Sequence, residues 1–406
     1  MSFKGQGSKG MVQKQARSKK KVKKAKPRIK KVKAKSVQKK IKSSGKKVSS
    51  RPAKQKTSGR QKRQIELMDL ERLVELDFVR TTEAAALNAF RWLGKGDRRG
   101  AHAAAVDAMR GTLDLTSVSA TVVLGDVLNP KSDIQIGEKL GNWTKGSLKV
   151  DLAVIPVDGI DLVARGLWGA MTILVAASGE STKSSLMNVP CPLMEKIAYG
   201  PAVAAGPGQV HLDASVRDNL EIISMKLGQR VQDLNVAVLN REENQDLISK
   251  IRKAGASVQL IRVGEVGACM APSMPDTGTD VYMGMGGSTE AVLAAAALRC
   301  LGGGILTRMA PQKAQERKKV VETFGEKALE KQYSAEDLAR GDNVIFCATG
   351  ISDGCILRGV HVLGNSASTE SVVMRARFRT VRKIRATHDL GHKTIRLRSA
   401  GAEAKL

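Results

Sequence analysis

The sequence predicts an α/β fold with two α/β domains that follow a polybasic tail. Apolar residues at helical spacing alternate along the chain with short apolar runs rich in β-branched residues. Aromatic residues make up only 3% of the chain, while Ala, Val, Leu, Ile and Gly are plentiful. This composition is typical of thin strands covered by helices. Residues 64–406 are enough to bury a large core and to divide into two domains.

The first predicted domain combines residues 64–204 with residues 340–406. Its first helix begins near Gln64, where apolar residues start to recur at helical spacing, and ends at Gly94. A second helix covers about 100–113. The strands are apolar, β-branched runs, predicted at 119–125, 148–159, 169–178, 343–348, 371–378 and 381–388.

The second predicted domain spans residues 205–339 and repeats the alternation. Segments with an apolar stripe predict helices at 213–227, 243–254 and 288–301. Apolar runs between them predict strands at 234–239, 257–262 and 279–285. We therefore expect each domain to cover its strands with helices.

The tail, residues 1–63, carries 26 Lys and Arg residues and neither Asp nor Glu. Because the whole chain has a net charge of +29, the body that follows is left with about +3. Apolar residues in the tail are too few to offset chain entropy, which predicts disorder in isolation. Such a segment binds polyanions by releasing their counterions. Phe3 is its only aromatic residue, so base stacking is not expected to contribute.

We expect the tail to contact the phosphates of nucleic acid, chiefly structured RNA or a ribonucleoprotein. The residues expected to make these contacts are Lys19, Lys20, Lys21, Lys23, Lys24, Lys26, Arg28, Lys30, Lys31, Lys33, Lys35, Lys39 and Lys40. Anionic lipid is a weaker candidate because the tail has no apolar anchor. A solvated tail or an organelle-targeting segment is the open alternative.

Cysteine usage indicates a reducing compartment. The five cysteines are scattered and form no CxxC pair, so neither a disulfide framework nor a zinc site is predicted. No apolar run reaches membrane-spanning length, and the N-terminus has no hydrophobic signal region. The expected location is therefore intracellular and soluble, in the cytoplasm or an organelle matrix.

Three strand ends punctuated by glycine are candidate positions for a site. They are Gly125–Asp126, Asp158–Gly159 and the MGMGG segment that precedes Glu290. Glycines at a strand end let backbone N–H groups approach a phosphate, and a following helix N-terminus adds partial positive charge. Carboxylates on neighbouring strand ends can hold a divalent metal. Turn-forming glycines beside solvated acids would give the same pattern.

Seven segments of the body match motifs of one family, in the family's order. They are TTEAAALNAFRWLGKGD (81–97), AAVDAMR (104–110), IGEKLG (136–141), MEKIAYGP (194–201), MGMGGSTEAV (283–292), GDNVIFCATGISDG (341–354) and STESVVMRARFRTVRKI (368–384). On these segments the body, from about Met68 to Leu390, resembles the class II fructose-1,6-bisphosphatases. The tail is not part of the resemblance.

The resemblance implies a layered α/β/α sugar-phosphatase fold with two α/β subdomains, related to the lithium-sensitive phosphatases. It also implies Mn²⁺- or Mg²⁺-dependent removal of the 1-phosphate from fructose 1,6-bisphosphate. Some photosynthetic members also act on sedoheptulose 1,7-bisphosphate. The chemistry needs metal ions to neutralise the phosphate and to orient the attacking water.

At the metal positions that the resemblance implies, this chain departs from the family pattern. Arg98 stands where the family has Lys, and His102 stands where it has its first metal-binding Asp. Asp126, in GDVL, replaces a metal-binding Glu and so withdraws the ligand oxygen by one methylene. The far metal-binding Glu is kept as Glu290, beside Gly287.

The largest departure lies in IPVDGI, where the family has DPxEGT. Ile155 replaces the central metal-binding Asp, and Asp158 replaces a Glu. Ile160 replaces the Thr that orients the attacking water, whereas Gly159 is kept.

The residues implied to bind the sugar phosphate have changed as well. Leu193 replaces an aromatic residue before MEK. The KPR motif reads Arg241, Glu242 and Glu243, and the DGD motif reads Val263, Gly264 and Glu265. Glu243 in place of Arg would repel a phosphate.

These replacements predict a degenerate metal site on an intact fold. Ile155 offers no ligand atom and Ile160 offers no hydroxyl to hold water. We therefore expect a catalytically inactive pseudoenzyme that needs no cofactor. It would serve as a structural or binding module tethered to nucleic acid by its tail, with homo-oligomerisation through the body left open.

The alternative is an active Mn²⁺- or Mg²⁺-dependent fructose-1,6-bisphosphate 1-phosphatase with an altered site and an incidental basic extension. Several acids remain near the site and would then act as relocated ligands. They are Asp97, Asp126, Asp133, Asp158, Asp161 and Glu290.

Overall fold

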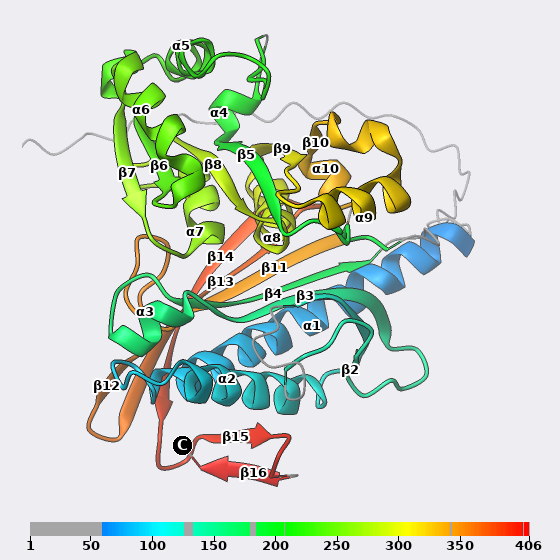
Figure 1. Ribbon diagram of the computed structural model, residues 1–406. Helices are drawn as coiled ribbons and strands as arrows, with labels where there is room; N and C mark the ends of the chain where they lie inside the picture. Colours follow the sequence, from blue (N-terminus) through cyan, green and yellow to red (C-terminus); the bar gives the residue numbers. More distant parts are fainter. Residues whose placement is uncertain are drawn as a thin grey trace, which may run out of the picture. The chain divides into compact units, whose positions relative to one another are not determined.

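The computed structural model describes residues 59–125, 133–178, 184–206, 208–341, 343–400 and 402–405, and within these ranges it describes side chains from residue 74 to residue 400 (Figure 1). Residues 57–406 form one compact unit. The predicted disorder of the tail and the predicted roles of Asp126 and of the tail lysines lie outside the described residues. Only residues 59–63 of the predicted tail are described, and they begin a helix.

An eight-stranded mixed sheet forms one half of the unit. Its strands are β1 (Val118–Gly125), β2 (Lys139–Leu140), β3 (Leu148–Asp158), β4 (Met171–Ser178), β11 (Asn343–Gly350), β12 (His361–Leu363), β13 (Ser366–Arg375) and β14 (Thr380–Asp389). They lie in the order β12-β13-β11-β4-β3-β1-β2, with β14 paired to β13. Strand β1 runs parallel to β3, whereas β4 runs antiparallel to both β3 and β11. The central strands are buried on both faces, which explains their continuous apolar sequences.

A six-stranded sheet forms the other half. Its strands are β10 (Tyr333–Ser334), β9 (Gly304–Met309), β5 (Leu193–Tyr199), β8 (Val281–Gly287), β6 (Asn235–Leu239) and β7 (Ser257–Ile261), in that order. Strand β6 runs parallel to both β7 and β8, whereas β5 runs antiparallel to β8 and β9.

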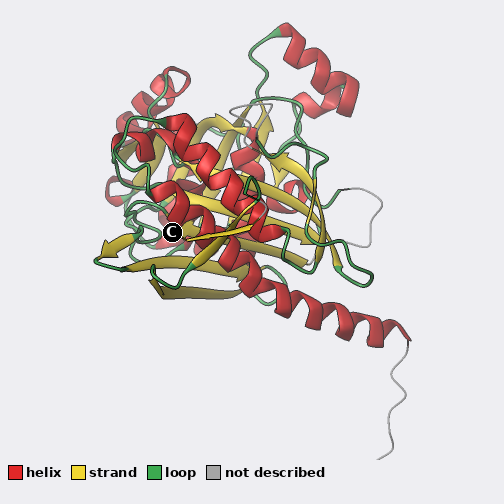
Figure 2. Cartoon of the chain, turned by 90° about the horizontal axis from the view of Figure 1, so that it is seen from below, coloured by secondary structure: helices red, strands yellow, loops and turns green. Residues whose placement is uncertain are grey.

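Helices and sheets alternate in layers. Helices α1 (Gly59–Phe90) and α2 (Arg98–Leu113) pack together and cover one face of the eight-stranded sheet (Figure 2). Helix α8 (Ser288–Leu301) lies between the two sheets, contacts strands of both and is buried almost all round (Figure 1). Its run of alanines keeps the helix thin enough for both sheets to approach it. Helices α5 (Val216–Leu227) and α6 (Gln245–Ala254) pack against β6 and β8 through a third apolar cluster.

Shorter elements complete the unit. They are α3 (Ile160–Arg165), α4 (Pro201–Ala204), α7 (Glu265–Met270), α9 (Ala314–Phe324), α10 (Ala335–Leu338), the 3₁₀ turns Val231–Asp233, Glu242–Asn244, Ala271–Ser273 and Glu326–Leu329, and the C-terminal hairpin β15 (Thr394–Leu397) and β16 (Ala402–Lys405). Within the described ranges, no helix is long and apolar enough to cross a membrane.

The predicted α/β class is confirmed, while several element boundaries differ from the prediction. Helix α1 begins at Gly59, five residues before the predicted start, and β8 runs on to Gly287. The predictions omitted β5, β9, α9 and the C-terminal hairpin. The division of the body into two domains stays a prediction.

Candidate functional site

The candidate site is built around the turn that joins β3 to α3. Asp158 ends β3 with its side chain buried, and Gly159 follows in the left-handed region at φ 84°. The left-handed conformation favours glycine, and a β-carbon here would also lie 2.8 Å from Leu162 Cδ1, so that this side chain would have to shift. Ile160 begins α3 and is 8% exposed.

Hydrocarbon occupies two positions at this turn where the resemblance implied oxygen ligands. Ile155 is 3% exposed and packs in the apolar cluster that contains Ile173 and Val175 of β4. Ile160 packs in the cluster on the opposite face, with Leu162 and Val163. Both side chains therefore belong to the core and offer nothing to a cation or a water molecule.

Helix α2 carries two further predicted site residues, which point into different surroundings. Asp97 caps the helix by accepting a hydrogen bond from Gly100 N at 2.9 Å. Arg98 is exposed, and its Nε lies 3.0 Å from the Asp161 carboxylate. One turn later His102 is buried, with Nε2 3.3 Å from Asp133 Oδ2. The position implied for the first metal ligand therefore holds a buried His–Asp pair.

The loop that carries Asp133 is fixed to α2 by an arginine. Arg110 donates to Glu138 at 2.9 and 2.8 Å and to the Asp133 carbonyl at 2.7 Å. Burial raises the pKa of the Glu138 carboxyl, but hydrogen bonds from Arg110 and from Gln135 N outweigh it and lower that pKa below its usual value. The AAVDAMR and IGEKLG segments thus meet in one structural contact.

A buried charge network occupies the position of the DGD motif. Lys196 Nζ, with its side chain fully buried, donates to Glu265 Oε1 at 2.5 Å and to the Gly287 carbonyl at 2.6 Å. Tyr282 Oη donates to Glu265 Oε1 at 2.8 Å, and Gly287 N donates to Oε2 at 2.9 Å. Both carboxylate oxygens of Glu265 are therefore satisfied by the protein itself.

The network lies close to the last two predicted acids. Burial raises the pKa of the Cys269 thiol well above its usual value, and the negative charge of Glu265 is the next largest cause. The charges of Asp158 and Glu290 also raise this pKa. The Glu290 carboxylate also covers Gly287, because a β-carbon placed there would overlap it. Asp158 at the end of β3 and Glu290 in the first turn of α8 therefore both act electrostatically on the same buried thiol.

The predicted sugar-phosphate residues are divided between two cavities. Glu243 lines a cavity of about 350 Å³ together with Lys196 and Met285. Val263 and Gly264 line a second, largely apolar cavity of about 430 Å³. Arg241 is exposed at the start of a 3₁₀ turn. At the positions that the resemblance implied for sugar-phosphate binding, the chain thus presents the acid Glu243 to one cavity and the hydrocarbon of Val263 to the other.

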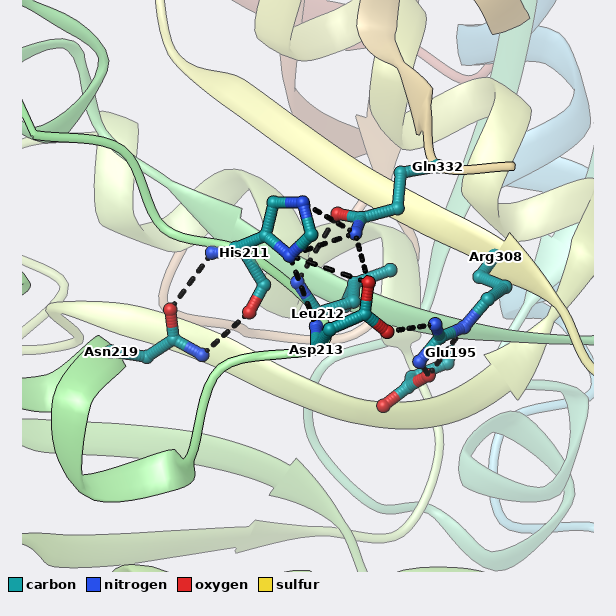
Figure 3. Close-up of polar contacts among 7 residues, drawn as sticks. All are labelled: Glu195, His211, Leu212, Asp213, Asn219, Arg308 and Gln332. Atoms are coloured by element: carbon teal, nitrogen blue, oxygen red, sulfur yellow. Dashed lines mark hydrogen bonds and ion pairs between the residues drawn. The ribbon is translucent and has the colours of Figure 1, made fainter. Parts of the chain in front are cut away.

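A polar cluster beside the first cavity was not predicted from the sequence (Figure 3). Arg308 of β9 pairs with Glu195 at 2.7 Å and with Asp213. Gln332 Nε2 contacts the His211 ring and donates to Asp213 at 3.0 Å. The hydrogen bond from Arg308 lowers the pKa of the Asp213 carboxyl. These groups satisfy one another and tie the 211–213 loop to the sheet. Of these residues, only Glu195 lies in a matched segment, MEKIAYGP, and nothing in that segment indicates its partners.

Comparisons with known proteins decide the family. Residues 72–388 match the family model described as bacterial fructose-1,6-bisphosphatase, glpX-encoded. The chain is 37% identical over 334 residues to the fructose-1,6-bisphosphatase class 2 of Haemophilus influenzae, covering 79% of this chain and 97% of that protein. It is 36% identical over 335 residues to a Synechococcus D-fructose 1,6-bisphosphatase class 2/sedoheptulose 1,7-bisphosphatase, covering 77% of this chain and 94% of that protein.

The chain belongs to the class II fructose-1,6-bisphosphatase family. The resemblance seen in its motifs is therefore confirmed. Residues 1–71, which include the polybasic segment, lie outside the matched range. The family assignment thus covers the folded unit, and the tail has to be considered separately.

The described residues do not fit the pair of metal ions that class II fructose-1,6-bisphosphatases imply. Within the described ranges, no three His, Cys, Asp or Glu side chains are grouped so that they could hold a metal ion. Three of the six acids weighed as relocated ligands already have protein partners: Asp97 caps α2, Asp161 pairs with Arg98, and Asp133 pairs with His102. We therefore derive no catalytic step through a metal.

Removing the cation of the buried pair should destabilise this class II fructose-1,6-bisphosphatase fold strongly. Lys196→Met leaves the Glu265 carboxylate buried without its cation, and such truncations cost about 3–5 kcal/mol. Urea unfolding of the purified chain measures the loss.

The double variant Lys196→Met/Glu265→Gln should recover part of the lost stability, because no buried charge is left. Lys253→Met, at an exposed position of α6, is the control and should change stability by less than about 0.5 kcal/mol. A cost below 1 kcal/mol for Lys196→Met would contradict this account of the pair.

Proposed function

We propose that this member of the class II fructose-1,6-bisphosphatase family is a catalytically inactive pseudoenzyme. In this proposal the folded unit serves as a structural or binding module, and the polybasic tail tethers it to nucleic acid or to a ribonucleoprotein. The observation that carries the proposal is the apolar burial of Ile155 and Ile160 at the turn after β3.

The loss of catalysis follows from the chemistry that those positions would have to supply. Metal ions neutralise the phosphate and generate or orient the nucleophile, which together stabilise the transition state by several kcal/mol. Each 1.36 kcal/mol that is lost slows the reaction about tenfold. Asp158 and Glu290 are retained, but hydrocarbon at residues 155 and 160 replaces the central ligand and the water-orienting hydroxyl. The Lys196–Glu265 network supports the same proposal, because its groups bind each other.

The tethering role rests on the charge of the tail. The tail has 26 basic residues without an acid, and the family match begins only at residue 72. Its positive charge is therefore additional to what the family fold requires. Counterion release gives such a segment affinity for any phosphate backbone without sequence preference. A location in the cytoplasm or an organelle matrix would give the tail access to RNA.

Thermal unfolding with and without Mn²⁺ tests the metal part of the proposal. A ligand that binds only the folded state stabilises it by RT ln(1 + [L]/Kd), so an intact metal site would raise Tm in a saturable way. We expect no saturable shift for the natural chain. The triple variant Ile155→Asp/Asp158→Glu/Ile160→Thr restores the family residues. Its Tm with Mn²⁺ should be higher than its own Tm in EDTA. A clear saturable shift in the natural chain would show that the remaining acids form a site.

A further inference from the structure

The positive charge of the body is concentrated near its C-terminus. Residues 375–398 contain nine Arg or Lys residues and one acid, Asp389. By contrast, residues 64–374 contain 32 basic and 37 acidic residues, so the rest of the body carries an excess of negative charge. A body that is close to neutral overall therefore has one strongly basic segment, apart from the tail.

This segment forms the hairpin of β13 and β14. Strand β14 pairs with β13 along its whole length, from Ser366↔Asp389 to Arg375↔Thr380, and among the described strands it pairs with no other. It is therefore an edge strand whose outer edge pairs with no other described strand. Five exposed residues at the turn and along this edge define what we call the hairpin surface: Arg377, Phe378, Arg379, Lys383 and Arg385.

The cations of the hairpin surface differ from Arg375, Arg382 and Arg398 in having no acidic partner among the described residues. Arg375 and Arg382 both contact Glu75 of α1, at 2.8 and 3.4 Å. Arg398 pairs with Asp114 and Glu138 at 3.2 and 2.7 Å.

Among the described residues, none of the four cations of the hairpin surface has a carboxylate within 4.0 Å. Lys383 reaches only the Ile356 carbonyl at 3.2 Å, and Arg377 reaches the Asn343 amide oxygen at 3.4 Å. Four exposed positive charges on one edge thus remain available to an anionic partner.

An aromatic side chain lies among these cations. Phe378 is 46% exposed, and its ring centroid lies 5.1 Å from the Arg375 guanidinium and 5.8 Å from that of Arg377. An exposed ring in a positively charged groove or edge is the usual platform on which an unpaired base stacks, while the cations contact the backbone phosphates. A lipid surface would instead call for a broad apolar face, and here only Phe378 and Val381 are exposed apolar groups.

We propose that the hairpin surface is a second nucleic-acid site, located on the folded body, and that it binds a single-stranded segment. One base stacks on Phe378, and Arg377, Arg379, Lys383 and Arg385 contact neighbouring phosphates. The tail supplies affinity for any phosphate backbone, whereas the hairpin surface selects strands with accessible bases. This inference does not depend on the tail, so the two can fail separately.

The test compares two variants of the full chain that lose the same number of charges. The hairpin variant is Arg377→Gln/Arg379→Gln/Lys383→Gln/Arg385→Gln. The control variant is Arg252→Gln/Lys253→Gln/Lys319→Gln/Lys327→Gln, at exposed positions of α6, α9 and the following 3₁₀ turn that also have no carboxylate partner among the described residues. Both variants keep the tail, so the tail contributes equally to the affinity of each. Fluorescence anisotropy with a labelled oligouridylate, and with an oligodeoxythymidylate of equal length, is measured over a salt titration.

We expect the hairpin variant to bind both probes more weakly than the control variant. Its log–log salt slope should fall by about 0.7 for each phosphate contact that is lost, up to about 3 for four contacts. Phe378→Ala should weaken binding about tenfold with an almost unchanged slope, because stacking releases no counterions. Equal affinity and slope for the hairpin and control variants would overturn the inference. Binding to phosphatidylserine vesicles that depends on the hairpin, without such dependence for the oligonucleotides, would overturn it as well.

Discussion

Deletion of residues 1–63 should remove most of the nucleic-acid affinity of this protein. The deletion takes away 26 positive charges and leaves a body of about +3. On duplex DNA the full chain should show a log–log salt slope of about −0.9 per phosphate contacted. If ~6–10 phosphates are engaged, affinity should fall ~10³–10⁵-fold between 50 and 200 mM salt. A salt titration of both chains with RNA and with duplex DNA measures the effect.

The fold should survive this deletion, which is checked by circular dichroism. The tail has few apolar residues, and the family match begins at residue 72. Weak binding that remains should be directed to single strands and should depend on Arg377, Arg379, Lys383 and Arg385. Equal affinity of the truncated and full chains for duplex DNA would place the main binding surface on the body. Salt-insensitive binding by the full chain would argue against a phosphate-backbone mechanism.

Most of the fold was predictable because its central elements are either amphipathic or apolar along their whole length. The strand β3 and the helix α8 are buried almost throughout, so their sequences identify them without knowledge of any partner. The helix α8 was predicted with the bounds that the structure shows. The class and the order of these elements follow from local sequence alone.

The elements that the prediction missed depend on partners distant in sequence. Strand β5 contains Lys196, whose burial is possible only because Glu265 lies opposite it, 69 residues further along the chain. The C-terminal hairpin docks on α2 because Ser399 N donates to Asp107 at 2.8 Å and Arg398 pairs with Asp114. No periodicity within either segment records these contacts.

The candidate site was predicted only in part, because some of its contacts also join residues that are distant in sequence. The sequence correctly marked Asp158 and Gly159 as the end of a strand, since glycine after an apolar run identifies such a turn. It did not indicate that Asp133 faces His102, nor that Glu243 and Val263 line different cavities. Those relations depend on contacts between separate elements, such as the contact between α2 and the loop that Arg110 holds. Local patterns do not encode such contacts.

Phosphate release from fructose 1,6-bisphosphate in the presence of Mn²⁺ or Mg²⁺ is the most direct test of the central claim. The assay uses the purified full chain, with the Haemophilus influenzae fructose-1,6-bisphosphatase class 2 as the positive control. Because buried Ile155 and Ile160 stand at the positions that the resemblance implies for a metal ligand and a water-orienting hydroxyl, the chain should release no phosphate above background. Metal-dependent turnover in the common enzyme range of ~1–10³ s⁻¹ would contradict the pseudoenzyme proposal and favour the active phosphatase.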